Sequence, residues 1–511
     1  MYPQVSAPSM KAWIVPALLG FALLAGCADD NSDPSPGDQT TQRYGEAIRY
    51  ELPADPMPDG AGHDHAAVDQ HKFLWNYEFS GRDPLLQNAA NVAGVHALDV
   101  QAGYLFGAVY GSHGAAVDGG LVIWDLADPS HPVQTGRWVI PGSVGGDRSM
   151  EATLDGDYAV ISTEPVDCAG HVNPGGVVAA YLIDTSDKAL PVVADVMTLT
   201  GGTLGNTLGG NAPVGFPELG QHSVAVHRIQ GEDYAFVFGK IFHIERSEQG
   251  AVLVRVGDVS TGHDIYVRDT PWNTTWAISA NGGGGMVVYD VTVPSAPFEV
   301  ATWNLEEREA LAANGTEYYF HTADVSFQDG QIIFVLTSED FGDHVSPLWV
   351  IDGNPLQGMT GKPEESVKLE KIGTWQNPGN HVATTAISFS LHNPRFHDGG
   401  LLTLSSYHGG MWQLDIRHPE FWAAPAPIGY AVLADGSPPA VEDPIEDLVS
   451  TQLCGLEIQL DAPSYWDVEV GVDGVTYLAD GFMGLYTFTP TADHPVYGNA
   501  TKGTYLGTAG T

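Results

Sequence analysis

The sequence predicts an all-β protein, a seven-bladed β-propeller with four antiparallel strands in each blade. Seven segments of similar pattern recur along the chain, and self-similarity of this kind is typical of repeat architectures. The 61 Gly and 34 Pro suit many short strands joined by tight turns, whereas amphipathic runs of helical length are scarce. A closed ring of such units leaves no long exposed sheet edge.

The first residues, 1–27, are predicted to be an export signal rather than part of the fold. Met10 and Lys11 open a positively charged start, and a short apolar run ends in the sequence Leu-Ala-Gly-Cys at Cys27. This run is too short for a comfortable membrane span. The segment resembles the signal peptide of bacterial lipoproteins, in which the cysteine is lipidated and becomes the mature N-terminus. The resemblance implies an exported protein anchored by lipid at the outer membrane or the cell surface.

Residues 28–70 are rich in Asp, Ser, Pro and Gly, which predicts a flexible tether between the lipid and the fold. Toward its end the tether carries a histidine cluster, with His63 and His65 followed by His71. Two interpretations remain open. The cluster is either a mobile arm that collects metal ions or a chance grouping on a solvated linker.

Two cysteines remain once Cys27 is lipidated, namely Cys168 and Cys454. In an oxidising compartment such a pair is compatible with one disulfide. The second interpretation is that they are soft ligands for copper or zinc. The sequence does not establish their geometry, so both interpretations stay open.

From residue 71 to residue 511 the chain is predicted to form the propeller. The first unit shows its strands most clearly: Val95–Val100, Tyr104–Tyr110, Gly120–Asp125 and Val133–Trp138. An Asp-Pro turn precedes the fourth strand, where Pro fixes φ at a position that needs no ladder donor. The third-strand pattern recurs at 177–184, 286–290, 348–352 and 411–415, weakly at 484–488, and in altered form around 241–256.

Two of these third-strand segments, Leu121–Asp125 with the following Asp128-Pro129, and Ser406–Asp415, resemble the LVIVD-repeat propellers of secreted and surface proteins. The resemblance covers roughly residues 90–490. It implies architecture far more than activity. The chain departs from the family pattern in its third unit and in its long loops.

A histidine recurs at the start of the inner strand in five of the seven units. The other two units have Met150 and Trp466 at this position, each followed by an acid. Because inner strands begin at one mouth of the central channel, these side chains are expected to converge there. Loops carrying His171 and His344 are expected on the same face. Imidazole is the commonest ligand for Zn, Cu, Fe and Ni.

The sequence therefore predicts a transition-metal site at this mouth, with Zn or Cu favoured and Fe as a further choice. The predicted ligand pool is His96, His222, His263, His321, His392, His408, His113, Glu151 and Asp467. Acids such as Asp264 and Asp324 are expected to orient the rings. Aromatic residues expected near the mouth, which would suit a small substrate, are Trp272, Trp276, Tyr407 and Trp466.

A structural role for the histidines is the alternative, because duplication copies residues and an imidazole can bridge neighbouring blades. That alternative predicts a histidine in all seven units, and two units lack one. Other chemistry is weakly supported. There is no nucleophile elbow, zinc-protease helix or phosphate loop, and the acidic pair Glu339-Asp340 is set aside because such pairs are common by chance in an acidic chain.

The net charge of −43, from 63 acidic and 20 basic residues, excludes nucleic acid as a partner. The first functional hypothesis is a lipid-anchored, monomeric metal-binding propeller of the cell envelope. It would act as a metal chaperone or store that serves an envelope partner or transporter, or as a metal-dependent oxidoreductase with unassigned catalytic residues. The histidine arm resembles that of periplasmic zinc-chaperone propellers. The alternative is a non-catalytic surface interaction module with structural histidines.

Overall fold

The structure is a computed structural model. It describes residues 47, 49, 73–83, 85, 94–110, 119–140, 149–163, 179–198, 223–260, 262–305, 318–339, 347–378, 390–397, 399–432, 450–453, 456–459, 464–481 and 484–498. The predicted signal peptide, the histidine arm and all three cysteines lie outside these residues. Within the described part of the chain, no helix is both long and apolar enough to cross a membrane.

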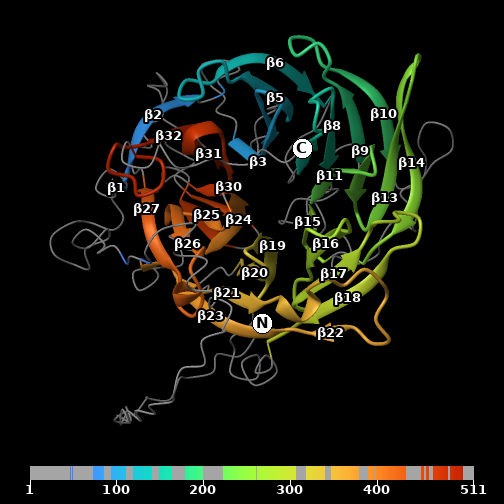
Figure 1. Ribbon diagram of the computed structural model, residues 1–511. Helices are drawn as coiled ribbons and strands as arrows, with labels where there is room; N and C mark the ends of the chain where they lie inside the picture. The colour runs from blue at the N-terminus through green and yellow to red at the C-terminus, as the bar shows by residue number, and fades with distance from the viewer. Residues whose placement is uncertain are drawn as a thin grey trace, which may run out of the picture.

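Seven small antiparallel sheets stand in a ring around a central channel, which confirms the predicted seven-bladed propeller (Figure 1). Blades one to three follow one another along the chain. Blade one consists of β3 (Gly94–Gln101), β4 (Tyr104–Tyr110), β5 (Gly120–Asp125) and β6 (Val133–Val139). Blade two consists of β7 (Met150–Ala152), β8 (Tyr158–Thr163), β9 (Ala179–Asp184) and β10 (Val192–Thr198). Blade three consists of β11 (Val224–Ile229), β12 (Glu232–Val237), β13 (Lys240–Ser247) and β14 (Gly250–Asp258).

Blades four to seven complete the ring. Blade four consists of β15 (Asp264–Asp269), β16 (Thr275–Ala280), β17 (Met286–Asp290) and β18 (Phe298–Trp303), and blade five of β19 (Phe320–Gln328), β20 (Gln331–Ser338), β21 (Pro347–Asp352) and β23 (Glu370–Gln376). Blade six consists of β24 (Leu391–His397), β25 (Leu401–Ser406), β26 (Gly410–Asp415) and β27 (Ala426–Val432). Blade seven contains β30 (Tyr465–Val470), β31 (Thr476–Asp480) and β32 (Gly484–Pro490). Shorter elements are β22 (Val367–Lys368), the hairpin β28 (Ser450–Leu453) with β29 (Leu456–Gln459), and the 3-10 turns η4 (Asn354–Leu356), η6 (Pro419–Phe421) and η7 (Val472–Gly474).

The N-terminal strands close the ring. β2 (Tyr77–Asp83) pairs antiparallel with β32 and supplies the outer strand of blade seven, while β1 (Phe73–Trp75) adds a fifth strand to blade six. Blade seven is therefore built from both ends of the propeller sequence, and the ring cannot open without breaking the β2–β32 ladder. Earlier still, Arg49 donates to the backbone oxygen of Ala424, so this position of the predicted tether is docked on blade six.

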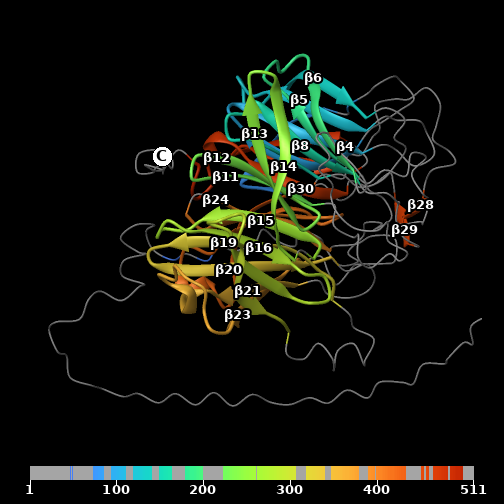
Figure 2. The ribbon, with the colours of Figure 1, turned by 90° about the vertical axis from the view of Figure 1, so that its right-hand side faces the viewer.

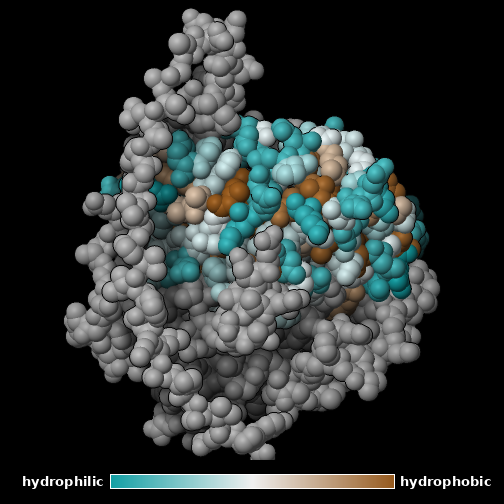
Figure 3. Space-filling view, turned by 90° about the horizontal axis from the view of Figure 1, so that it is seen from below, coloured by the Kyte–Doolittle hydropathy of each residue, from teal (hydrophilic) through white to brown (hydrophobic). Residues whose placement is uncertain are grey.

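Hydrophobic clusters fill the interfaces between neighbouring blades. Trp276 of blade four stacks against Phe334 of blade five at a centroid distance of 6.3 Å, and both rings are fully buried. Trp412 of blade six packs at a tilt against Trp375 of blade five, with ring centroids 5.4 Å apart. Such aromatic pairs contribute both buried area and geometric specificity. Figure 2 shows the ring edge-on, and the described surface in Figure 3 is mainly hydrophilic, as the acidic composition predicts.

Side chains on the inner strands also join the blades through hydrogen bonds. Each acceptor on one inner strand receives a backbone N–H of the next inner strand. The pairs are Asp99 with Ala152 N (2.7 Å), Glu151 with Val226 N (2.7 Å), Ser223 with Ile265 N (3.0 Å), Asp324 with Phe396 N (2.9 Å) and Asp467 with Leu98 N (2.8 Å). These acids are thus part of the channel wall.

The pairing of the inner strands is interrupted where the repeated residue stands. In β3 the register skips His96, in β24 it skips His392 and Asn393, and similar shifts occur in β19 and β30. A bulge of this kind lets two successive side chains face the same side. The channel therefore receives both the histidine and the residue after it, which simple alternation does not predict.

Candidate metal centre

Three imidazoles from consecutive blades meet at one end of the channel. His263 directly precedes β15, His321 lies on β19 and His392 lies on β24. The ring centroids of His263 and His321 are 4.2 Å apart, and those of His321 and His392 are 3.9 Å apart. All three residues are at most 5% exposed. The predicted convergence thus occurs for these three histidines.

The carboxylate of Glu339 faces all three rings. Glu339 follows β20, and its backbone N–H donates to Tyr319 O at 2.9 Å, which holds it beside the start of β19. Its Oε2 lies 3.9 Å from His263 Nε2 and 3.7 Å from His321 Nε2, and its Oε1 lies 4.0 Å from His392 Nε2. One carboxylate therefore lies within 4.0 Å of an imidazole nitrogen from each of three blades, with His263 and His321 facing Oε2 and His392 facing Oε1.

The spacings within the group of His263, His321 and Glu339 fit three positions of a tetrahedral metal ion after a small contraction, and His392 lies beside this group. Bonds of about 2.0–2.1 Å in a tetrahedron imply donor–donor distances of about 3.3 Å. The donor atoms of His263, His321 and Glu339 lie within 4.8 Å of one another. The measured gaps to Glu339 exceed the tetrahedral edge by well under 1 Å, which modest side-chain rotation can close.

The outer nitrogen of His321 is held by a hydrogen-bonded hydroxyl. His321 Nδ1 lies 2.6 Å from Thr322 Oγ1, whose single proton is shared between Asp264 Oδ2 at 2.7 Å and Asn393 Oδ1 at 2.9 Å. A hydroxyl has one proton, and both of its other partners are acceptors, so Nδ1 of His321 must donate. In a neutral ring, Nε2 then carries a lone pair toward Glu339. The expectation that Asp264 orients a ring is met through Thr322.

Two tyrosines flank the site. Tyr407 donates to Glu339 Oε1, and its ring lies edge-on to His392 at 5.2 Å. Tyr319 lies edge-on to His263 at 5.1 Å and is 40% exposed. Because Tyr407 occupies Oε1, Oε2 is the oxygen more available to a metal. Tyr319 marks the side on which the described part of the site reaches solvent.

Trp466 separates His96 from the three clustered histidines. The Trp466 ring lies 4.3 Å from His96 and 5.9 Å from His392. Blade seven thus places an indole where its neighbours place imidazoles. His408 lies in the turn between β25 and β26, next to Tyr407. His222 and His113 lie outside the described residues, as do His171, His344, His63, His65 and His71.

Two aromatic residues expected at this mouth lie elsewhere. Trp272 occupies the hairpin after β15, and Trp276 lies at the adjoining end of β16, so both are at the opposite end of the inner strand from His263. Trp272 Nε1 donates to Met359 O at 2.7 Å, which fixes it against blade five. The expectation placed them by sequence proximity to His263, although a full strand separates them. Tyr407 and Trp466 do lie at the mouth.

Glu151 and Asp467 lie deeper in the channel, in a charged layer centred on Arg395. Arg395 of blade six reaches Glu469 of blade seven at 2.9 Å, Glu151 of blade two at 3.6 Å and the Tyr266 ring of blade four at 4.3 Å. One guanidinium therefore spans the channel. Asp467 accepts from Asn393 Nδ2 at 2.9 Å and from Leu98 N.

Burial is the main cause of the raised pKa values of the carboxyl groups in this layer. It raises the pKa of both Glu151 and Glu469 to about 8, against the opposing effect of Arg395. The pKa values of Asp99 and Asp467 are raised for the same reason. The layer therefore holds neutral carboxyl groups at pH values where an exposed acid would be ionised.

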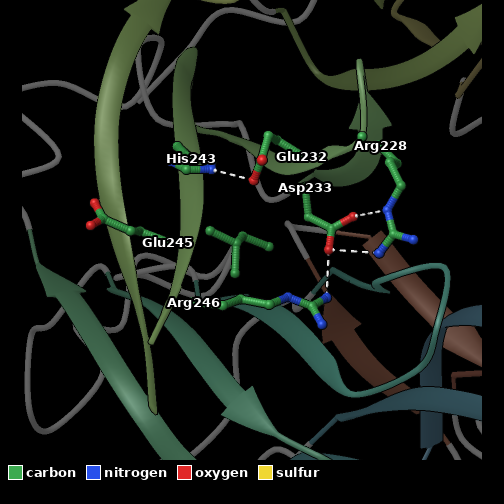
Figure 4. Close-up of a pocket in the computed structure, with 8 residues that line it drawn as sticks. Arg228, Glu232, Asp233, His243, Glu245 and Arg246 are labelled. Atoms are coloured by element: carbon green, nitrogen blue, oxygen red, sulfur yellow. Dashed lines mark hydrogen bonds and ion pairs between the residues drawn. The ribbon is translucent and has the colours of Figure 1, made fainter. Parts of the chain in front are cut away.

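A separate pocket of ≈ 290 Å³ lies on blade three (Figure 4). There Arg228 and Arg246 both bridge Asp233 of their own blade and Asp155 of blade two, with Arg228 2.7 Å from Asp233 and Arg246 2.9 Å from Asp155. His243 pairs with Glu232 at 3.2 Å. The charges satisfy one another, so this cluster clamps two blades together and has no donor set directed at a ligand.

Comparisons with known proteins identify no family and assign no activity. No family model matches the sequence, and no curated protein matches it. Similar solved structures include the WD40 β-propeller domain of Doa1 (TM-score 0.43, 11% identity, covering 82% of this chain and 97% of that chain). A putative 6-phosphogluconolactonase from Bacteroides uniformis is also similar (TM-score 0.40, 12% identity, covering 73% of this chain and 88% of that chain). So is the periplasmic gluconolactonase PpgL of Pseudomonas aeruginosa (TM-score 0.42, 10% identity, covering 66% of this chain and 86% of that chain). Likeness at this level carries no argument about function.

Proposed function

We propose that this protein binds a divalent transition metal, Zn or Cu, through His263, His321, His392 and Glu339. The observation that carries the proposal is the shared orientation of three Nε2 atoms toward one carboxylate, at 3.7–4.0 Å. For His321 the facing nitrogen bears a lone pair, because Nδ1 donates to Thr322. The lone pair on His321 Nε2 and the negatively charged oxygen of Glu339 repel each other, and a cation bound between these two atoms removes that repulsion.

The donor types select the class of metal. Three imidazoles and one carboxylate suit Zn, Cu, Ni or Fe, whereas Ca and Mg prefer all-oxygen sites. Among these ions Cu binds most strongly to such a set, followed by Zn or Ni. Thr322 and Asp264 supply the acceptor chain that metal-ligating histidines usually have behind them.

A holding role is better supported than catalysis. Catalytic Zn sites usually keep three protein ligands and one open position, whereas four protein donors make a closed set. Here the fourth donor, Glu339, is itself fixed by Tyr407 and by its backbone bond to Tyr319. We infer a metal store or chaperone of the cell envelope, anchored through Cys27, with the His63, His65 and His71 arm able to pass ions to or from the mouth.

The test is metal stoichiometry with matched variants. The full chain, carrying Cys27→Ser to prevent lipidation, is stripped with chelator and titrated with Zn or Cu at about pH 7.5, where free imidazole is neutral. We expect one tight site per chain, lost in His263→Gln/His321→Gln. The matched control is His227→Gln/His243→Gln, because these histidines pair with Asp269 and Glu232 on blades three and four, away from the site.

Two further results separate the rival interpretations. If tight metal binding persists in the His263→Gln/His321→Gln variant but is lost in the His63→Gln/His65→Gln/His71→Gln variant, the metal is bound by the arm. That result would contradict the proposal. A folded protein that binds neither metal tightly would favour structural histidines and an interaction module.

A further inference from the structure

A layer of buried charge lies directly behind the metal centre, on the same inner strands. The ionisable groups that surround Arg395 and its neighbours Tyr266 and Arg268 form this carboxyl layer. Besides those three residues it contains Asp99 on β3, Glu151 on β7, Asp264 on β15, Asp324 on β19, and Asp467 and Glu469 on β30. Six carboxyl groups thus face two guanidinium groups. Arg268 pairs with Asp324 at 3.0 Å, and Arg395 with Glu469 at 2.9 Å.

This excess of acid cannot all be ionised in a buried channel. Uncompensated buried carboxylates cost several kcal/mol each, so such groups keep their protons or acquire a cation. Arg395 occupies the centre, where it contacts Glu151, Glu469 and Tyr266 from three other blades. A second metal ion beside this guanidinium would be repelled, which leaves the proton as the balancing cation.

A second observation points to a ligand in the same layer. Tyr266 is 3% exposed, and its hydroxyl has no hydrogen-bond partner among the described residues. Its ring is covered by Arg395 at 4.3 Å and by Arg268 at 5.0 Å, and its charged neighbours include Asp264, Asp324 and Asp467. A buried phenol beside three carboxyl groups can donate to a water or accept from a protonated acid.

Hydrogen bonds connect this layer to the metal centre. His321 Nδ1 donates to Thr322, whose single hydroxyl proton is shared between Asn393 Oδ1 at 2.9 Å and Asp264 Oδ2 at 2.7 Å. Asn393 Nδ2 then donates to Asp467 Oδ1 at 2.9 Å. The bulges in β19 and β24 make this possible, because they turn Thr322 and Asn393 into the channel beside their histidines.

We propose that the carboxyl layer is a proton-binding site linked to the metal centre, so that protons held by Glu151 and Glu469 leave for solvent when a metal ion binds. The proposal rests on the proposed function. In the exchange, a divalent ion enters at His263, His321, His392 and Glu339, and one or two carboxyl O–H bonds ionise, their protons passing to the buffer. Charge in the channel is thereby kept nearly constant.

Thermodynamic linkage makes this coupling reciprocal: metal binding promotes proton release from the carboxyl layer, and proton binding to the layer weakens metal binding. The pKa of each glutamate, raised to about 8 by burial, places this exchange near neutral pH rather than at the pH of ordinary acids. A store with this property takes up metal at alkaline pH and gives it up on mild acidification. Free imidazoles contribute only below about pH 6.5, so the two sources separate in pH.

The experiment counts protons released per metal ion in the full chain, by calorimetry in buffers of different ionisation enthalpy. Zn is the probe, and the range is about pH 7 to 8.5, above the usual imidazole pKa. We expect the wild type to release at least about one proton per ion, which makes the apparent Kd fall about tenfold per pH unit for each proton. In Glu151→Gln/Glu469→Gln the release and the slope should both fall. Glu232→Gln/Glu245→Gln, on the blade-three pocket, is the matched control.

An infrared measurement on the metal-free wild type needs no substitution. Protonated buried carboxyl groups should give a carbonyl band near neutral pH that disappears as pH rises above about 8 and weakens on adding Zn. Single variants Glu151→Gln and Glu469→Gln serve if the double variant does not fold.

The outcomes distinguish this inference from the proposed function. Tight Zn binding with undiminished proton release in a folded variant would overturn the linkage and leave the metal proposal standing. Absence of tight Zn binding would overturn both, even if the carbonyl band is present. Metal binding with reduced release in the glutamate variants, but not in the control, supports both.

Discussion

Thr322 holds His321 in one tautomer: its hydroxyl oxygen lies 2.6 Å from Nδ1, and its O–H donates a hydrogen bond to Asp264. Replacing Thr322 with Val keeps the shape but removes this acceptor. We expect Thr322→Val to weaken metal binding by about 10–100-fold, because outer hydrogen-bond partners of metal ligands typically contribute this much. Thr322→Ser should retain affinity. Chelator competition measures both, and equal affinity of the Val variant and the wild type would show that the hydroxyl is not orienting a ligand.

Arg395 is predicted to be a principal stabilising residue of the channel. Above about pH 8, where Glu469 is ionised, Arg395→Met leaves a buried carboxylate without its compensating charge, and breaking a buried pair typically costs about 3–5 kcal/mol. The matched control is Arg255→Met, which removes an exposed pair with Asp258 and should cost at most about 1 kcal/mol. Denaturant unfolding compares the two. Equal small losses would mean that the channel charge is not coupled to folding.

The ionisation of Glu151 is predicted to lower the stability of the folded protein as the pH becomes alkaline. Its folded pKa of about 8 exceeds the ordinary 4.5, so the folded state binds more protons between these values. Its contribution to stability is full below about pH 4.5 and is lost as pH rises through 8. Glu151→Gln should therefore gain stability relative to the wild type from pH 6 to about 9, as measured by thermal unfolding. A difference that does not change with pH would contradict this assignment.

His494 is predicted to act in the opposite pH range. Burial, with His397 and Arg417 nearby, lowers its pKa to about 3, and its Nδ1 accepts backbone N–H bonds from Val496 and Tyr497. The unfolded state therefore gains a proton below about pH 6.5 that the folded state does not, so stability falls between about 6.5 and 3. His494→Gln should show a shallower acid decline. An unchanged decline would mean that other groups control it.

Much of the architecture could be predicted because the repeat pattern is local. The predicted strands Tyr104–Tyr110 and Gly120–Asp125 agree with the observed bounds, since alternation and turn residues mark their ends. The closure of blade seven by β2 could not be predicted in this way. Its partner β32 is some four hundred residues away, as the contact of Ser80 with Thr489 illustrates (separation 409), and pairing at that range leaves no local signal.

The site was predictable only in part. His263, His321 and His392 follow from the repeat, but Glu339 does not, because pairs of acids such as Glu339-Asp340 are common by chance in an acidic chain. The useful signal was topological: Glu339 directly follows the second strand of the blade whose inner strand carries His321, so it returns to the same mouth. The bulges that turn Thr322 and Asn393 into the channel depend on register shifts, which alternating patterns do not reveal.

The most direct test of the metal centre is anomalous diffraction from crystals of the Zn- or Cu-loaded protein, collected on both sides of the metal absorption edge. The account predicts one strong peak among His263 Nε2, His321 Nε2, His392 Nε2 and Glu339 Oε2, with bonds of about 2.0–2.2 Å. A loaded protein with no peak there, or with its peak only among His63, His65 and His71, would contradict it.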